Sequence, residues 1–218
     1  MAAKNNMIGL AFTHATAKLK STNSNREFFG TNPICFAAPT NLNANFCFDS
    51  SQSFMSFHEI LKRRKTKKIL PNYVAADING KITNNPQKAI QLLPIGDYKG
   101  MGMAMMVDIL CSLLTGMNYG PRISKMYSPY NEKRNLGHFF IAININAFEN
   151  IKKFKDRLTD MCIELKKTNT KNSIVFYPGE KENIFYKKRI KDGIPINKSD
   201  KNNLINLSKE FKINIKFN

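Results

Sequence analysis

The stretch that decides the fold is Phe28-Phe29-Gly30-Thr31-Asn32-Pro33-Ile34-Cys35-Phe36-Ala37-Ala38-Pro39. Its second half, Ile34 to Ala38, has the apolar character of a strand, and a polar turn precedes it. In that turn Gly30 allows close backbone approach, Asn32 offers a donor and an acceptor, and Pro33 fixes the chain direction. An ordinary turn explains these residues on their own, so their meaning depends on what surrounds them.

Further strands and helices are expected on both sides of this stretch. Apolar runs predict strands at Met7 to Phe12, Phe46 to Phe48, Phe139 to Ile145 and Ser173 to Tyr177. Helices are predicted at Gln52 to Leu61, at Met101 to Met117, at Glu149 to Lys167 and after a cap at Ser199. Because strands and helices are interspersed, we expect a mixed α/β domain with a large, partly antiparallel sheet and flanking helices.

Composition narrows the possible classes of protein. Of 218 residues, 42% are hydrophobic, which is too many for a disordered tail. The longest apolar stretch, Met101 to Met117, is short for a membrane span and contains Asp108. The four cysteines form no CxxC pair and there are three histidines, so neither a disulfide framework nor a metal site is predicted. We expect reduced core cysteines in a cytoplasmic protein.

The net charge of +18 raises the possibility of an anionic partner. One dense basic run, Lys62 to Lys68, has no aromatic residue alternating with it and no known nucleic-acid motif beside it. We therefore interpret the run as a solvated basic loop and expect neither nucleic acid nor a membrane as the partner.

Three further segments combine a charged group with glycine. Lys99, between glycines at the start of an apolar helix, would suit an anion, although a tight turn explains the glycines equally well. Arg134, before the strand at Phe139, would suit a carboxylate, although most arginines simply lie on the surface. The turn from Tyr177 to Glu180 would let a ligand approach the backbone. His14, His58 and His138 show no positioned partner and are interpreted as structural or exposed.

The order of these segments resembles the type 2 malate/L-lactate dehydrogenase family. The matching segments are Gly30-Thr31-Asn32-Pro33, the Asp49-Ser50-Ser51-Gln52-Ser53 segment in place of D-M-A-T-S, Tyr73 to Pro86, Leu93 to Gly102, Arg134-Asn135-Leu136-Gly137 and Tyr177-Pro178-Gly179. The last two are most similar to the ureidoglycolate dehydrogenase branch of that family. The resemblance covers nearly the whole of the sequence.

The resemblance implies a fold, a reaction and a set of residues. NAD, with NADP as the alternative, would be bound without a Rossmann fold by Asp49, Ser50, Ser51, Lys99, Gly179 and Glu180. Arg134 would hold the carboxylate of a 2-hydroxy acid while a hydride passes between its CH–OH carbon and the nicotinamide. The branch implies oxidation of (S)-ureidoglycolate to oxalurate in purine catabolism by a homodimer. Malate, lactate and sulfolactate are the alternative substrates.

Two departures from the family pattern limit this expectation. The family's catalytic histidine lies in an N-terminal third that has no counterpart in residues 1–218, and no catalytic residue is assigned in its place. A substrate-contacting serine of the branch is Ala15 here. We therefore expect residues 1–218 to be the C-terminal portion, with the cofactor-binding domain and a C-terminal segment. An inactive relic or a basic binding module are the alternatives from another class.

Overall fold

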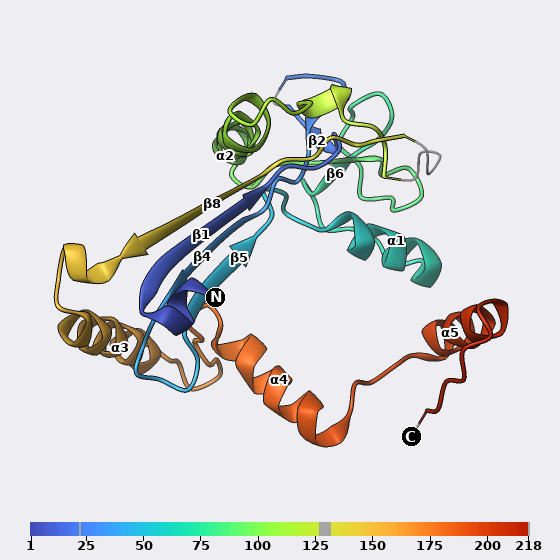
Figure 1. The fold of residues 1–218 in the computed structure, drawn as a ribbon. Helices are drawn as coiled ribbons and strands as arrows, with labels where there is room; N and C mark the ends of the chain where they lie inside the picture. Colours follow the sequence, from blue (N-terminus) through green and yellow to red (C-terminus); the bar gives the residue numbers. More distant parts are fainter. Residues whose placement is uncertain (22, 127–131, 218) are drawn as a thin grey trace. The chain divides into compact units, whose positions relative to one another are not determined.

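The chain folds into two compact units, Met1–Gly179 and Glu180–Asn218. The computed structural model describes residues 1–21, 23–126 and 132–217 (Figure 1). Within this described part, no helix is long and apolar enough to cross a membrane. A short 3-10 turn, η1 (Ala2–Asn5), precedes the first strand, and two others, η3 (Gly120–Arg122) and η4 (Ile145–Ala147), lie between main elements.

The first sheet is antiparallel and has the strand order β5-β4-β1-β8. Its strands are β1 (Met7–Thr13), β4 (Ile34–Ala38), β5 (Phe46–Ser50) and β8 (His138–Asn144). The strands predicted in these four regions of the sequence are therefore confirmed. Phe12 lies opposite both Ile34 and Phe139 in the register. Paired residues share a face of the sheet, so these three side chains form one apolar surface.

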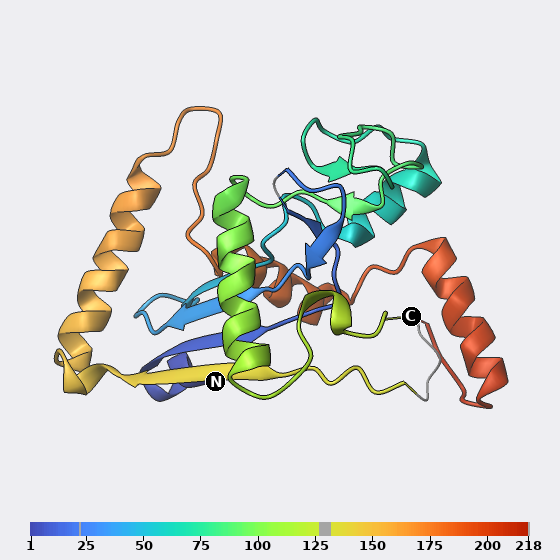
Figure 2. The same cartoon turned by 90° about the horizontal axis from the view of Figure 1, so that it is seen from above.

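The long apolar helix covers that surface. It consists of α2 (Tyr98–Asp108) and a π-helical turn, η2 (Ile109–Leu113), and Figure 2 shows it crossing the strands. Val107 and Cys111 are fully buried against Phe12. The sequence predicts a buried helix, yet Leu113 is 60% exposed. A helix that lies on a sheet buries one stripe, so an apolar composition alone overestimates its burial.

The second sheet is small and has the order β3-β2-β7-β6. Its strands are β2 (Leu19–Lys20), β3 (Glu27–Phe29), β6 (Ala75–Ala76) and β7 (Gln91–Leu92), and β2 pairs with β7 in parallel. Strands of two or three residues carry no measurable periodicity, which is why the sequence does not predict them. Leu19 and Leu92 pack with Ile60 in the largest core cluster.

The helix predicted at Gln52 to Leu61 begins later and ends later, as α1 (Phe57–Thr66). Ser56 caps it by accepting the N–H of Glu59. The interpretation of the basic run as a loop is wrong, because most of the run forms the C-terminal half of α1. Arg64 donates hydrogen bonds from there to the carbonyls of Pro86 and Ala89, so one arginine of the run holds neighbouring chain in place.

The C-terminal half of the first unit contains α3 (Ile151–Lys167), which confirms the predicted amphipathic helix. Asn150 caps it, and Cys162 packs with Ala44 and Tyr177. The strand predicted at Ser173 to Tyr177 is wrong. Within the described residues that segment pairs only through an isolated bridge at Ser173, and its end is held by the Tyr177 hydroxyl, which donates to Ala44 O (3.0 Å).

The second unit contains α4 (Glu180–Asp192) and α5 (Lys198–Glu210). The sequence analysis does not predict α4, and none of its residues is buried. The N-cap of α5 is Asn197, which accepts the N–H of Asp200, and not Ser199.

The cysteines also differ from the prediction of core residues. Cys111 and Cys162 are buried, but Cys35 is half-buried and Cys47 is exposed, with 3.9 Å between their sulfur atoms.

We predict that Leu92→Ala lowers the free energy of unfolding by about 3 kcal/mol, because Leu92 is fully buried and the cavity adds to the lost transfer energy. Leu113→Ala is the matched control; its side chain is 60% exposed, so a change of less than about 1 kcal/mol is expected. Urea unfolding of both variants measures this difference. Equal losses would show that the second sheet does not form the main core.

Candidate functional site

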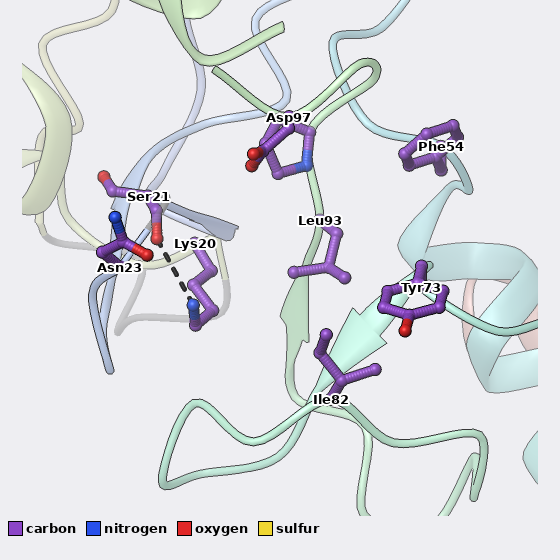
Figure 3. Close-up of a pocket in the computed structure, with 9 residues that line it drawn as sticks. Lys20, Ser21, Asn23, Phe54, Tyr73, Ile82, Leu93 and Asp97 are labelled. Atoms are coloured by element: carbon purple, nitrogen blue, oxygen red, sulfur yellow. Dashed lines mark hydrogen bonds between the residues drawn. The ribbon is translucent and has the colours of Figure 1, made fainter.

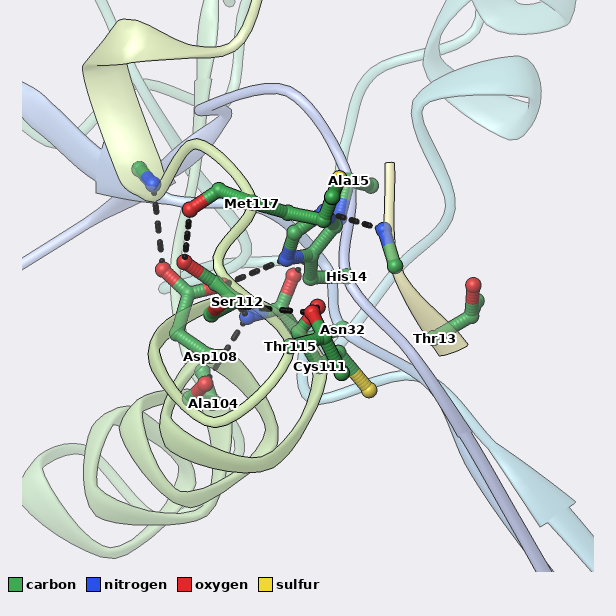
Figure 4. Close-up of polar contacts among 12 residues, drawn as sticks. Thr13, His14, Ala15, Asn32, Ala104, Asp108, Cys111, Ser112, Thr115 and Met117 are labelled. Atoms are coloured by element: carbon green, nitrogen blue, oxygen red, sulfur yellow. Dashed lines mark hydrogen bonds and ion pairs between the residues drawn. The ribbon is translucent and has the colours of Figure 1, made fainter. Parts of the chain in front are cut away.

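A buried carboxylate, that of Asp108, lies at the centre of a polar network (Figure 4). Its Oδ1 accepts from the side-chain amide of Asn32 (3.0 Å), and its Oδ2 accepts from Gly120 N–H (3.1 Å). Asn32 also donates to Ala104 O (2.8 Å) and accepts from Ala15 N–H (3.0 Å). Through these bonds α2 holds the chain after β1, the turn before β4 and the chain around Gly120.

The turn at Gly30 to Pro33 is therefore more than an ordinary turn. Asn32 has a φ of 37°, in the left-handed region that asparagine tolerates better than most residues. A Cβ on Gly30 would lie 2.2 Å from Ala15 O, so only glycine fits beside the chain that follows β1. The turn presents Asn32 to Asp108, which is the specific role that its residues serve.

His14 is the second buried polar group of the network and is 1% exposed. Its Nε2 accepts from Gly137 N–H (3.1 Å), so that nitrogen carries no proton. Its Nδ1 lies 3.8 Å from Asp108 Oδ1 and makes no hydrogen bond within the described residues. Burial lowers the pKa of His14, and the charges of His138 and Arg134 lower it further. Burial raises the pKa of Asp108, while the hydrogen bonds from Asn32 and Gly120 lower it by less.

Arg134 lies beside this network and is half-buried. Its Nη2 donates to Thr16 Oγ1 (2.8 Å) and its Nε to Ser124 O (3.4 Å). Among the residues that the structure describes, no carboxylate lies within ion-pair distance of its guanidinium. Because both acceptors are neutral oxygens, they do not neutralise the positive charge of the guanidinium, which can attract an anion. The planar set of N–H donors matches the two oxygens of a carboxylate.

The segment expected to contact a cofactor begins where β5 ends. Asp49 is exposed there, and Ser50 and Ser51 are half-buried. Gln52 N–H donates to Thr31 O (2.7 Å), while Gln52 O accepts from Ile95 N–H (3.0 Å). The chain after β5 is thereby tied to the turn before β4 and to the chain that enters α2.

Lys99 lies in the first turn of α2 and is exposed. Gly96 has a φ of 59°, and a Cβ on Gly100 would lie 2.4 Å from Ile95 O, so the glycines do form a tight turn. The tight turn is confirmed, and it leaves Lys99 exposed next to the helix N-terminus. Asp97 is the N-cap residue, but its side chain makes no capping hydrogen bond. The carbonyls of Gly96 and Ile95 accept the N–H groups of Lys99 (3.2 Å) and Gly100 (2.8 Å) instead. The ammonium of Lys99 at the positive end of the helix dipole is therefore the group that suits an anion.

Gly179 and Glu180 are adjacent in the chain, at the boundary between the two units. Gly179 has a φ of 95° and packs at the start of β5, where a Cβ would lie 2.7 Å from Asn45 O. Next to it, Pro178 O accepts from Cys47 N–H (2.9 Å). Cys47 and Ser50 are three residues apart in β5, which corresponds to about 10 Å at the rise per residue of a β-strand. Glu180 begins α4 in the second unit.

A cavity of about 390 Å³ opens beside the segment that leads to Lys99 (Figure 3). Phe54, Tyr73 and Leu93 give it apolar walls, and Lys20 and Asp97 add opposite charges. Tyr73 has a φ of 58°, which is unusual for a bulky residue. The lining residues come from separate segments of the chain, so no sequence motif marks the cavity.

The remaining histidines and possible metal ligands add no further centre. His58 and His138 are exposed, and His138 Nδ1 forms a hydrogen bond with Thr13 Oγ1. Across residues 1–21, 23–126 and 132–217, no three metal-ligating side chains gather. The residue that sequence reasoning missed is Asp108. Its signal was a single acid in the middle of an apolar helix, which marks a buried and paired group.

The sequence has identifiable relatives. A family model described as malate/L-lactate dehydrogenase matches residues 1–204. The chain is 31% identical to the NAD(+) ureidoglycolate dehydrogenase of Escherichia coli K12, over 89% of this chain and 56% of that protein. It is 33% identical to the malate dehydrogenase of Pyrococcus abyssi, over 91% of this chain and 57% of that protein. The chain thus spans less than two thirds of these relatives.

Solved structures agree with this relationship. The malate dehydrogenase of Entamoeba histolytica superposes with a TM-score of 0.90 at 26% identity, covering 99% of this chain and 64% of that one. The sulfolactate dehydrogenase of Methanocaldococcus jannaschii gives a TM-score of 0.86 at 30% identity, covering 98% and 62%. The mixed α/β fold expected from the sequence is confirmed.

We predict a specific dependence of stability on pH. The pKa of His14 is lowered from its ordinary value of 6.5, so the unfolded chain binds its proton more tightly. The free energy of unfolding should therefore fall as the pH is lowered through 6.5. The pKa of Asp108 is raised from 3.8, which has the opposite sign: this contribution to the free energy of unfolding grows as the pH falls toward 3.8.

Chemical unfolding of the wild type and of His14→Gln between pH 8 and pH 5.5 tests this. The variant should lose less stability on acidification, because it has no histidine to protonate at this position. Parallel pH profiles for the two proteins would contradict the buried neutral state of His14.

Proposed function

The chain belongs to the malate/L-lactate dehydrogenase family, and on that premise we propose that its protein oxidises the CH–OH group of a 2-hydroxy acid with a nicotinamide dinucleotide. The observation that carries the proposal is Arg134, a half-buried guanidinium held by Thr16 and Ser124 with no carboxylate in ion-pair distance among the described residues. We propose that it binds the substrate carboxylate through a bidentate pair.

The leading substrate is (S)-ureidoglycolate, which would give oxalurate. Support comes from the E. coli relative, whose name states that activity, and from the match of Arg134-Asn135-Leu136-Gly137 to that branch. Malate and sulfolactate are the alternatives, since the P. abyssi and M. jannaschii relatives carry those names. Lactate is a further alternative that the family description supports.

The residues at the end of β5 and the start of α2 fit a dinucleotide. The ammonium of Lys99, at the positive end of the α2 dipole, would hold its phosphates. The hydroxyls of Ser50 and Ser51, which bond Ser51 O and Ser53 Oγ in this structure, would turn to the same phosphate oxygens. The exposed carboxylate of Asp49 would accept from ribose hydroxyls and repel a 2′-phosphate, which supports NAD over NADP. When bound, the nicotinamide ring accepts or donates the hydride.

Gly179 and Glu180 complete the proposed cofactor contacts. The backbone at Gly179 lies against the start of β5, so a ligand that extends along this strand would reach it. We further propose that residues 1–218 act as the cofactor-binding portion of a cytoplasmic homodimer. No general base is assigned among these residues. The unprotonated nitrogen of His14, Nε2, already accepts a hydrogen bond from Gly137 N–H, and the side chain is buried.

The first experiment measures binding of NADH. We predict that Lys99→Ala weakens it about tenfold, because a charge-assisted contact to phosphate is lost. Lys88→Ala, at another exposed lysine, should leave the affinity unchanged. Fluorescence titration with and without added DNA also separates a specific nucleotide site from a basic binding surface. Equal weakening in both variants, or competition by DNA at moderate salt, would contradict the proposed site.

The second experiment identifies the substrate class. Oxalurate, oxaloacetate, pyruvate and sulfopyruvate are titrated into the protein with NADH present. We predict that Arg134→Lys weakens the best of them about tenfold or more, because an ammonium cannot form the bidentate pair. Arg122→Lys, at an exposed arginine, is the control. If no 2-oxo acid binds more weakly to Arg134→Lys than to the wild type, Arg134 is not the carboxylate site.

A further inference from the structure

We propose that His14 is a positioning residue, which holds Arg134 in place for the substrate carboxylate by accepting the hydrogen bond of Gly137 N–H. The inference rests on the proposed role of Arg134 and goes beyond it. It assigns to His14 a specific part in ligand binding that its burial alone does not require.

The first observation is a continuous set of contacts between two segments. The β1–β8 pairing ends with Thr13 opposite His138, whose side chains also form a hydrogen bond. Beyond the end of the sheet, the contacts continue in the same antiparallel direction. His14 accepts from Gly137 N–H, and Thr16 accepts from the guanidinium of Arg134. The segment that contains Arg134 is thereby held at two points, by the side chain of Arg134 and by the backbone N–H of Gly137.

The second observation is that the backbone anchor has no room to move. Gly137 is buried, and a Cβ there would lie 1.9 Å from Cys111 O, so the chain is pressed against the end of the helix. On its other side lies the imidazole of His14, which is 1% exposed. Water cannot replace the lost acceptor at such a depth, so removing the imidazole would leave Gly137 N–H unsatisfied. Between the two anchors, Asn135 has a φ of 50° and completes a tight bend.

The third observation links this anchor to the rest of the network. With Nε2 as the acceptor, the proton of the neutral ring is on Nδ1, which lies 3.8 Å from Asp108 Oδ1. The ring thus lies between the arginine segment and the helix that carries Lys99. The hydrogen bond that a side chain at position 14 has to make is the one it accepts from Gly137 N–H. Glutamine offers an acceptor for this N–H, and an apolar residue of similar length does not.

The test compares His14→Gln with His14→Met, two unbranched side chains of similar size, and uses His58→Ala, at an exposed histidine, as control. Dissociation constants are measured for NADH and, with NADH present, for oxamate as an unreactive 2-oxo acid analogue. We expect His14→Met to bind oxamate about tenfold more weakly, while its NADH affinity stays within about twofold. His14→Gln should restore most of the oxamate affinity.

The outcomes separate the possible explanations. If folded His14→Met binds oxamate as well as the wild type does, His14 only stabilises the fold and the proposal is overturned. If wild type binds NADH but not oxamate, the carboxylate role of Arg134 fails, and the inference fails with it. If wild type binds neither, the proposed function itself is wrong.

A second measurement covers the case in which His14→Met does not fold. Hydrogen exchange of the Gly137 amide is then compared between wild type and His14→Gln. Strong protection in both proteins supports the anchor, because both side chains offer an acceptor. Rapid exchange of this amide in the wild type would overturn it.

Discussion

Taking the carboxylate of Asp108 out of water has a free-energy cost that only the surrounding donors offset. Asn32 and Gly120 supply those donors; Asn32 lies 76 residues before Asp108 in the sequence, and Gly120 lies 12 residues after it, at the start of η3. The carboxylate therefore fixes two loops against the helix, and a third through the bond between Asn32 and Ala15. Asp108 thus helps to hold α2 against the turn before β4 and against the chain around Gly120.

The same helix connects the two halves of the proposed site. Lys99 lies in its first turn and Asp108 at its end, about 14 Å apart along the helix axis. The cofactor residues at the end of β5 are tied to the start of the helix through Gln52, and Arg134 is tied to its end through Gly137 and His14. In this way the helix that begins with α2 supports the residues at the end of β5 and the segment of Arg134, which lie far apart in the sequence.

Much of this was open to prediction from the sequence. Long strands and helices such as β1, β8 and α3 have a clear apolar pattern, and the ordered motifs led to the family. The strands of the second sheet have only two or three residues, which is too short for a periodic pattern. Helix α4 has no buried residue. Asp108 was recognised only as an acid in an apolar helix. Its partners Asn32 and Gly120 are 76 and 12 residues away, and only the fold brings them together.

We propose that the end of β5 and the start of α2 form one nucleotide site and that Arg134 forms the carboxylate site. The most direct measurement is a pair of amide NMR spectra of the labelled protein, one with NADH alone and one with NADH and oxamate. NADH should shift the amides of Ser50, Ser51, Lys99 and Gly100, and oxamate should then shift those of Thr16 and Gly137. Shifts from NADH confined to other surfaces, or none from oxamate near Arg134, would contradict this account.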